Sequence, residues 1–153
     1  MIMKRMVCFM LCLILPAAAY ALSDLDIMVE GHNLNRVICG AAELKNPEVE
    51  KGSYTYKATE NVHVIFTVRD DLANSCSCVC LDEADAAEFL AQCVTICYNY
   101  GGTEAGTQCY DPILFSFMQA RAGIETDKVI LPGIMFRIYK ESFGYAFVLA
   151  RVR

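Results

Sequence analysis

The sequence predicts an α+β domain: a small, disulfide-stabilised fold with a mostly antiparallel sheet packed on one main helix over residues 82–98. Two observations support this class. Several strand-like runs lie on either side of the single clear helix pattern, and nine cysteines are present. Strands and helices in mixed order are typical of α+β folds.

The first 21 residues have the three zones of a secretory signal peptide. Residues 1–5 carry two positive charges, residues 6–15 are uninterruptedly apolar, and a proline and small residues follow. Signal peptidase accepts small side chains before the cleaved bond, so cleavage is expected between Ala21 and Leu22. A membrane-spanning helix would need roughly 20 apolar residues. The sequence therefore predicts secretion, with residues 22–153 as one cysteine-rich domain.

The mature domain is acidic. Removing the leader takes two positive charges from a chain of net charge −5, which leaves −7. Phosphate binding requires clustered lysine and arginine, so nucleic acid is not an expected partner. The negative charge also disfavours a defensin-like toxin, because membrane-active peptides are usually cationic. No later apolar stretch is long enough for stable membrane insertion.

The N-terminal part of the mature chain has weak signals before its first strand. Residues 22–36 are predicted to be a loose arm or a first short element, and residues 37–51 a short helix interrupted at Pro47. Residues 62–68 are rich in β-branched and aromatic side chains, which predicts a buried strand.

The helix over residues 82–98 has signals at both ends. Asp82 is a suitable N-cap, and Gly101-Gly102 is a suitable stop. Its predicted apolar stripe consists of Ala86, Phe89, Leu90, Cys93 and Cys97. Three further strands are expected over residues 113–117, 129–138 (with a turn at Pro132-Gly133) and 145–152.

Cys8 and Cys12 leave with the leader, and seven cysteines remain. In an exported chain they predict a disulfide framework built from Cys39, Cys76, Cys78, Cys80, Cys93, Cys97 and Cys109. Because seven is odd, one cysteine stays free or forms an intermolecular disulfide.

The cysteine spacing predicts a staple between a strand and a helix. Cys76, Cys78 and Cys80 would share one face of a strand at ~6.5 Å intervals, and Cys93 and Cys97 one face of a helix about 6 Å apart. A helix lying on that strand would form two parallel disulfides, and the third strand cysteine would reach Cys109 or Cys39. Zinc bound by four thiolates is the alternative, which secretion disfavours. No metal or cofactor is expected.

No strong catalytic motif is present. The only histidines are His32 and His63, and the local acid–base candidate for His63 is Glu60. A strand would place positions 60 and 63 on opposite faces, which disfavours such a pair. No catalytic residue is predicted, and we expect no enzyme activity.

Short segments resemble small secreted fungal ribonucleases and ribonuclease-like effectors. They are Tyr54-Thr55-Tyr56-Lys57, Pro112-Ile113-Leu114, Asp127-Lys128-Val129-Ile130 and the strand-like residues 145–151. In that family the Pro-Ile-Leu motif ends a strand. Here Tyr110 stands in place of the general-base glutamate, Lys128 replaces an arginine, and no histidine follows His63. The resemblance implies a fold that has lost its catalytic set and serves as a binding scaffold.

The whole chain resembles the small cysteine-rich secreted effectors and avirulence proteins of plant-pathogenic fungi, including those of the rice blast fungus. It shares their signal peptide, short mature chain, many cysteines and lack of an enzyme motif. This resemblance implies a virulence role in host–pathogen interaction. The expected partner is a host protein, either an immune receptor or its guarded target, met in the apoplast or inside host cells. The alternatives are a secreted ribonuclease-like hydrolase and a defensin-like toxin.

Overall fold

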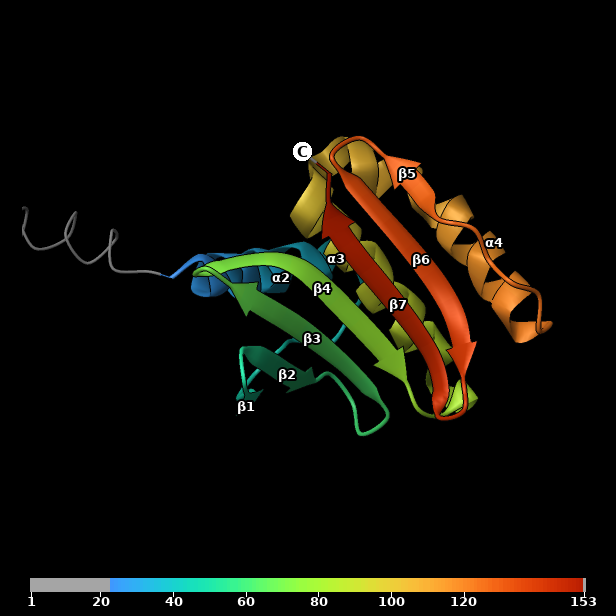
Figure 1. Ribbon diagram of the computed structural model, residues 1–153, viewed down its shortest axis with the longest axis horizontal. Helices are drawn as coiled ribbons and strands as arrows, with labels where there is room; N and C mark the ends of the chain where they lie inside the picture. The colour runs from blue at the N-terminus through green and yellow to red at the C-terminus, as the bar shows by residue number, and fades with distance from the viewer. Residues whose placement is uncertain (1–22, 153) are drawn as a thin grey trace, which may run out of the picture.

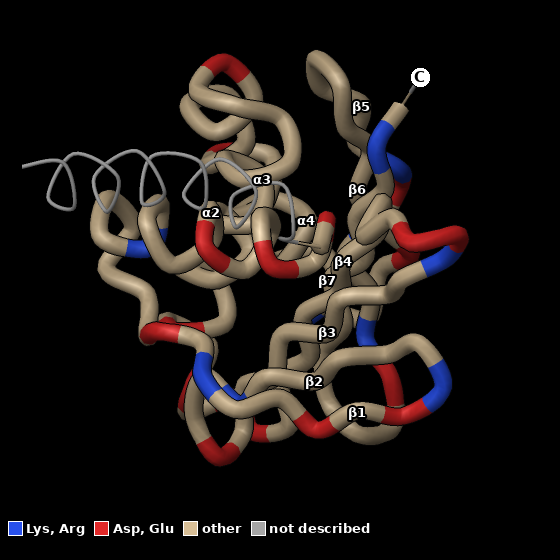
Figure 2. The backbone as a smooth tube through the Cα atoms, turned by 90° about the vertical axis from the view of Figure 1, so that its left-hand side faces the viewer, with Lys and Arg blue, Asp and Glu red and all other residues tan. Residues whose placement is uncertain are grey.

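A seven-stranded antiparallel sheet forms the centre of the computed structural model, which describes residues 23–152. The expected leader and the cleavage site at Ala21 and Leu22 lie outside these residues. The strand order is β1-β2-β3-β4-β7-β6-β5. The helices all cover one face of the sheet, and the other face is open (Figures 1 and 2). The predicted α+β class with an antiparallel sheet is confirmed.

One helix precedes four consecutive strands, and two further helices precede the last three strands. The strands are β1 (Glu48–Glu50), β2 (Ser53–Lys57), β3 (Val62–Arg69), β4 (Leu72–Cys80), β5 (Val129–Leu131), β6 (Ile134–Glu141) and β7 (Gly144–Arg151). The helices are α2 (Asp24–Cys39), the 3₁₀ turn η1 (Glu83–Asp85), α3 (Ala86–Gln108) and α4 (Tyr110–Arg121). None of the described helices is both long and apolar enough to cross a bilayer.

Side-chain alternation places the core between the sheet and the helices. In β3, Val62, Val64 and Phe66 are fully buried, whereas the residues between them lie on the open face. This period of two follows from strand geometry. The predicted strands over residues 62–68 and 145–152 are confirmed, and residues 129–138 form the predicted hairpin as β5 and β6.

The predicted helix over residues 82–98 is present but extends further. Asp82 caps the preceding 3₁₀ turn by accepting a hydrogen bond from the Ala84 amide. At Gly102 the backbone leaves helical geometry (φ 77°, ψ −170°), so the predicted stop is a kink, and the helix resumes to Gln108. The sheet thus packs on three helices rather than on one main helix.

The prediction of a loose arm over residues 22–36 is wrong, because α2 occupies most of this segment. Ser23 and Asp26 form a reciprocal capping box, and Gly40 ends the helix in the left-handed region. Only Leu25, Met28 and His32 of α2 are buried, so its apolar periodicity is weak in sequence. The short helix predicted over residues 37–51 is also absent: this segment contains the end of α2, a loop and β1.

The strand predicted over residues 113–117 is wrong, because these residues lie in α4. Pro112 falls in the first helical turn, where the amide hydrogens have no partner within the helix, so a proline there costs little. Ile113, Phe117 and Ala120 are buried at helical spacing. The Pro112-Ile113-Leu114 motif therefore does not end a strand, in contrast to the family that it resembles.

Replacing Gly144 in the β6–β7 turn by alanine should destabilise the fold strongly. Gly144 has a φ of 142°, and a Cβ there would collide with the backbone carbonyl of Cys80. We expect the free energy of unfolding to fall by about 3 kcal/mol. Gly133→Ala is the matched control, because Gly133 also has a positive φ (77°) but open space around it, and we expect a loss of about 1 kcal/mol. Urea unfolding followed by circular dichroism measures both, and equal losses would contradict the close approach.

Candidate functional site

The cysteines gather where α3 crosses the inner face of β4. Cys76, Cys78 and Cys80 are fully buried on this face, and Cys93 and Cys97 are fully buried on the facing side of α3. The spacing-based expectation that each set shares one face thus matches the structure. Cys109 lies between α3 and α4, and Cys39 is the last residue of α2.

The thiols form a chain of neighbours across this seam. Cys93 is a neighbour of Cys78, and Cys97 is a neighbour of Cys109 and also lies near Cys76 and Cys39. All seven described cysteines are thiols, and no pair is at bonding distance. Among residues 23–152, no group of three or more histidine, cysteine or acidic side chains has an arrangement that would hold a metal ion.

Burial controls the acidity of these thiols. It raises the pKa of Cys76 and Cys93 well above the usual value, because a thiolate there would lose its hydration. The pKa of Cys97 is raised because it donates its hydrogen bond to Cys109, and the pKa of Cys109 is lowered for the same reason. Reduced, these cysteines act as small apolar core residues.

The structure does not bring His63 and the Glu60 carboxylate together. The Nε2 atom of His63 lies 2.9 Å from the backbone carbonyl oxygen of Glu60, so the ring donates a hydrogen bond to the backbone at Glu60 and not to its carboxylate. The segments that resemble fungal ribonucleases are also dispersed. Residues 54–57 lie on β2, the second strand in the order, whereas residues 129–130 lie on β5, the edge strand on the far side of the sheet.

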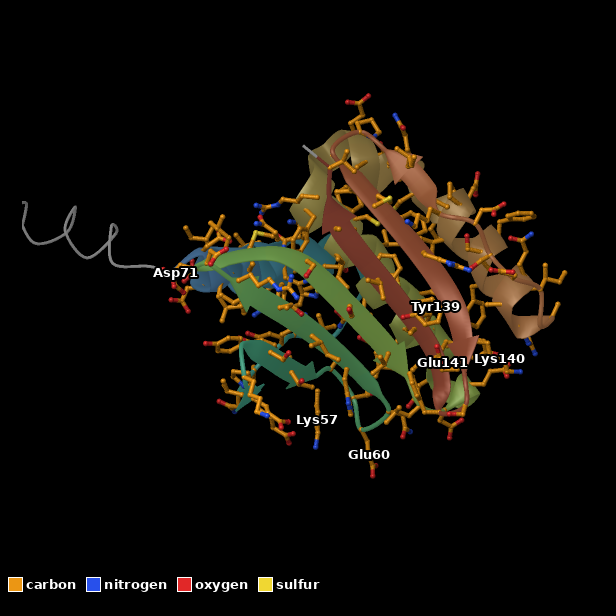
Figure 3. All side chains as sticks on the ribbon, in the orientation of Figure 1. Lys57, Glu60, Asp71, Tyr139, Lys140 and Glu141 are labelled. Atoms are coloured by element: carbon orange, nitrogen blue, oxygen red, sulfur yellow. The ribbon has the colours of Figure 1, made fainter. Side chains whose placement is uncertain are left out.

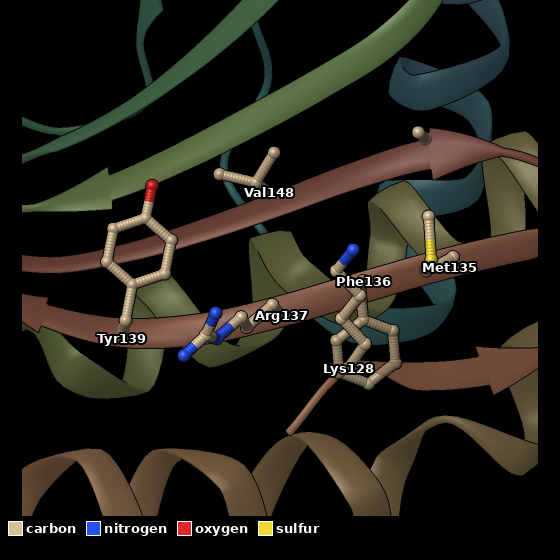
Figure 4. A pocket seen from close by; sticks show the side chains of 7 residues that line it. Lys128, Met135, Phe136, Arg137, Tyr139 and Val148 are labelled. Atoms are coloured by element: carbon tan, nitrogen blue, oxygen red, sulfur yellow. The ribbon is translucent and has the colours of Figure 1, made fainter. Parts of the chain in front are cut away.

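The open face of the sheet has a shallow depression. Its charged residues lie mainly near the strand ends, as Lys57 and Glu141 show in Figure 3. The depression lies over β6 and β7, has a volume of about 230 Å³, and is lined mainly by Met135, Arg137, Tyr139 and Val148 (Figure 4). Ligand pockets usually have larger volumes.

A larger groove of about 610 Å³ lies on the outer side of the helices. Its floor is the outward face of α3, with Leu90, Val94 and Tyr98. Ile38 at the end of α2 and Tyr110 at the start of α4 also line it. The lining is therefore mostly alkyl and aromatic.

Exposed apolar side chains continue from the groove along α2 and α4. Ile38 is 69 % exposed, and Leu34 and Val37 are exposed on the preceding turn of α2. On α4, the exposed apolar residues are Tyr110, Leu114, Phe115 and Met118. We call the groove and these residues the helix-layer surface. Residues 110, 114 and 118 are spaced by four, which places them on one face of a helix. This spacing would have indicated the surface only if the segment had been recognised as a helix.

The helices around this surface are acidic. Six acidic residues and two basic ones lie on α2, α3 and α4, namely Asp24, Asp26, Glu30, Glu88, Glu104 and Asp111 against Arg36 and Arg121. Acidic segments are visible along the helix layer in Figure 2. The described residues of these three helices therefore carry a net charge of −4, from six acidic and two basic side chains.

A buried polar network fixes α2 and its following loop to α3. The Nε2 atom of Gln92 donates to the Ala42 carbonyl at 2.9 Å and to the Glu88 carboxylate at 2.8 Å. Its Oε1 atom must therefore accept from His32 Nε2, 2.7 Å away. His32 is fully buried, and its Nδ1 atom has no hydrogen-bond partner among residues 23–152. A protonated, charged ring is therefore unfavourable at this position.

Comparison with family models, curated proteins and solved structures finds no match to this chain.

Acid should destabilise the fold through His32. Burial lowers its pKa from 6.5 to about 4 in the folded protein. Stability from this residue is therefore complete above pH ~6.5, and it decreases as the pH falls toward ~4, by roughly 3 kcal/mol in total. In His32→Gln, which keeps a donor for Gln92, this part of the pH dependence should disappear. Urea unfolding at a series of pH values measures both proteins, and parallel profiles would contradict the assignment.

Proposed function

We propose that the protein is a secreted effector that binds a host protein through the helix-layer surface, without catalysing a reaction, and that a plant resistance receptor recognises it. The observation that carries the proposal is the groove over α3. The resemblance to cysteine-rich fungal effectors supports secretion and interaction with a host. The groove provides a surface to which a host protein could bind.

The apolar outer face of α3 supports binding. A helix that is apolar on all sides is normally buried on all sides. The inner face of α3 packs on the sheet, but Ala87, Leu90 and Tyr98 on its outer face retain solvent exposure over the groove. Contiguous apolar patches of this kind usually mark interaction sites.

The chemistry around the groove favours a protein partner with a basic, apolar segment. Such a segment would place apolar side chains against Leu90 and Tyr98, and lysines or arginines against the acidic helices. The groove lining contains no histidine, carboxylate, lysine or arginine. General acid–base catalysis there would lack its usual groups, which favours binding over hydrolysis.

Replacing Ile38 by lysine should weaken partner binding at least tenfold with little loss of stability. The side chain is 69 % exposed at the edge of the groove, and lysine would both remove apolar contact and repel a basic partner. Ile130→Lys is the matched control, because Ile130 is 72 % exposed but lies on the edge strand β5. The mature wild-type and variant proteins would be immobilised and exposed to plant extract. Each retained protein would then be purified and its affinity measured by calorimetry.

The proposal predicts at least a tenfold weaker affinity for Ile38→Lys, which is about 1.4 kcal/mol, and wild-type affinity for Ile130→Lys. Equal affinity of all three proteins for the retained partner would place binding elsewhere. If no protein were retained and the mature chain hydrolysed RNA, the ribonuclease-like alternative would replace the proposal.

A further inference from the structure

The direction of α3 aligns its cysteines with those of β4. The chain reverses through η1, so the end of β4 meets the start of α3, and the start of β4 meets later turns. At the far end, the Tyr100 hydroxyl donates to the Ala73 carbonyl at 2.8 Å, which fixes the alignment. Between these points Cys78 lies against Cys93, and Cys76 lies near Cys97.

The spacing of the two pairs is compatible with two bridges at once. Alternate strand residues are ~6.5 Å apart, and residues one turn apart on a helix are about 6 Å apart. Both pairs can therefore approach together without a change in the path of either element. Disulfides require this match, because they tolerate little displacement of the two backbones.

A third pair lies at the end of the helix layer. Cys39 is the last residue of α2, with its thiol close to Cys97 and Cys109. Cys109 lies between α3 and α4, where its thiol donates to the Gly106 carbonyl at 3.2 Å. A Cys39–Cys109 bridge would therefore join α2 to the α3–α4 junction.

Only one set of these neighbours gives three bridges. Pairs within β4, or between Cys93 and Cys97, join side chains that project in parallel from one face and are geometrically poor. A Cys97–Cys109 bond would leave Cys76 and Cys39 without neighbours to pair with, and a Cys93–Cys109 bond would do the same to Cys78. Every other choice therefore forms at most two bridges.

We propose that the oxidised protein contains the disulfides Cys76–Cys97, Cys78–Cys93 and Cys39–Cys109, and that Cys80 keeps its thiol. The pairing stands independently of the proposed function. It completes the staple expected from the spacing, assigns each partner, and identifies the odd cysteine.

The surroundings of Cys80 are consistent with a retained thiol. Its side chain is fully buried, and its S–H donates to the Asp82 carbonyl at 3.1 Å. One turn before Cys93, α3 presents Phe89 instead of another cysteine. Burial also raises the pKa of Cys80 to about 11. An intermolecular disulfide through the odd cysteine is therefore disfavoured, because this thiol is neither accessible nor ionised.

The oxidation is balanced by thiol–disulfide exchange with a small disulfide or a dithiol oxidase. For each bridge, two cysteine thiols lose two electrons and two protons, and one S–S bond forms. The disulfide bond of the oxidant breaks and accepts the two electrons and two protons, which yields two thiols on the oxidant. Formation of all three bridges removes six hydrogen atoms from the chain.

Differential alkylation tests the pairing. The chain beginning at Leu22, which includes every described element, would be refolded in a mixture of oxidised and reduced glutathione. It would be denatured without reductant, labelled with N-ethylmaleimide, then reduced and labelled with iodoacetamide. Tandem mass spectrometry would locate each label, including those at neighbouring positions in β4. We expect maleimide on Cys80 alone.

Single serine variants identify the partners. Cys97→Ser should add a maleimide label at Cys76, Cys93→Ser at Cys78, and Cys39→Ser at Cys109. Cys80→Ser is the matched control, which should take up no maleimide. A wild-type label on any other cysteine would overturn the proposal, as would Cys97→Ser freeing Cys109 instead of Cys76. If a variant does not fold, the positions of the maleimide labels on the wild-type protein still test the proposal, because a label on any cysteine other than Cys80 would overturn it.

Discussion

The packing of α3 on β4 is the contact on which the other elements depend. β4 lies at the centre of the sheet, between β3 and β7, and α3 lies between α2 and α4. Cysteines at this seam are small, apolar and fully buried, so the helix can approach the strand closely. Phe66, Phe89 and Phe147 are fully buried in the same core cluster. Without this seam, the sheet would lose its cover on the inner face and the outer helices would lose their support.

The two faces of α3 have different roles in this account. The inner face stabilises the fold by burying apolar surface, which contributes roughly 25 cal/mol per Å². The outer face keeps apolar groups partly in solvent along the groove, which is unfavourable for the isolated protein. An exposed apolar face of this kind is expected when a partner covers it. The pairing of Cys39 with Cys109 would hold two sides of the groove together, and a rigid groove loses less entropy on binding.

Much of the sheet was predictable, because strand alternation and the Pro132-Gly133 turn are local signals. The cysteine seam was predictable for the same reason, since spacings of two and four match a strand and a helix. The helix-layer surface was not predictable. Beside its floor on α3, it is built from α2 and α4, and each of these two helices buries only a few side chains, such as Met28 and Ile113. The β-branched and aromatic residues around Ile113 favour a strand locally, and tertiary packing overrides that preference.

Hydrogen exchange of the refolded protein, measured by mass spectrometry before and after reduction, tests the central role of the α3–β4 seam most directly. The account predicts that the amides of α3 and β4 exchange most slowly in the oxidised protein. Reduction should accelerate their exchange more than that of the β5–β6 hairpin, because the bridges restrain local opening at the seam. Unchanged protection of α3 and β4 after reduction, or equal acceleration in every element, would contradict the account.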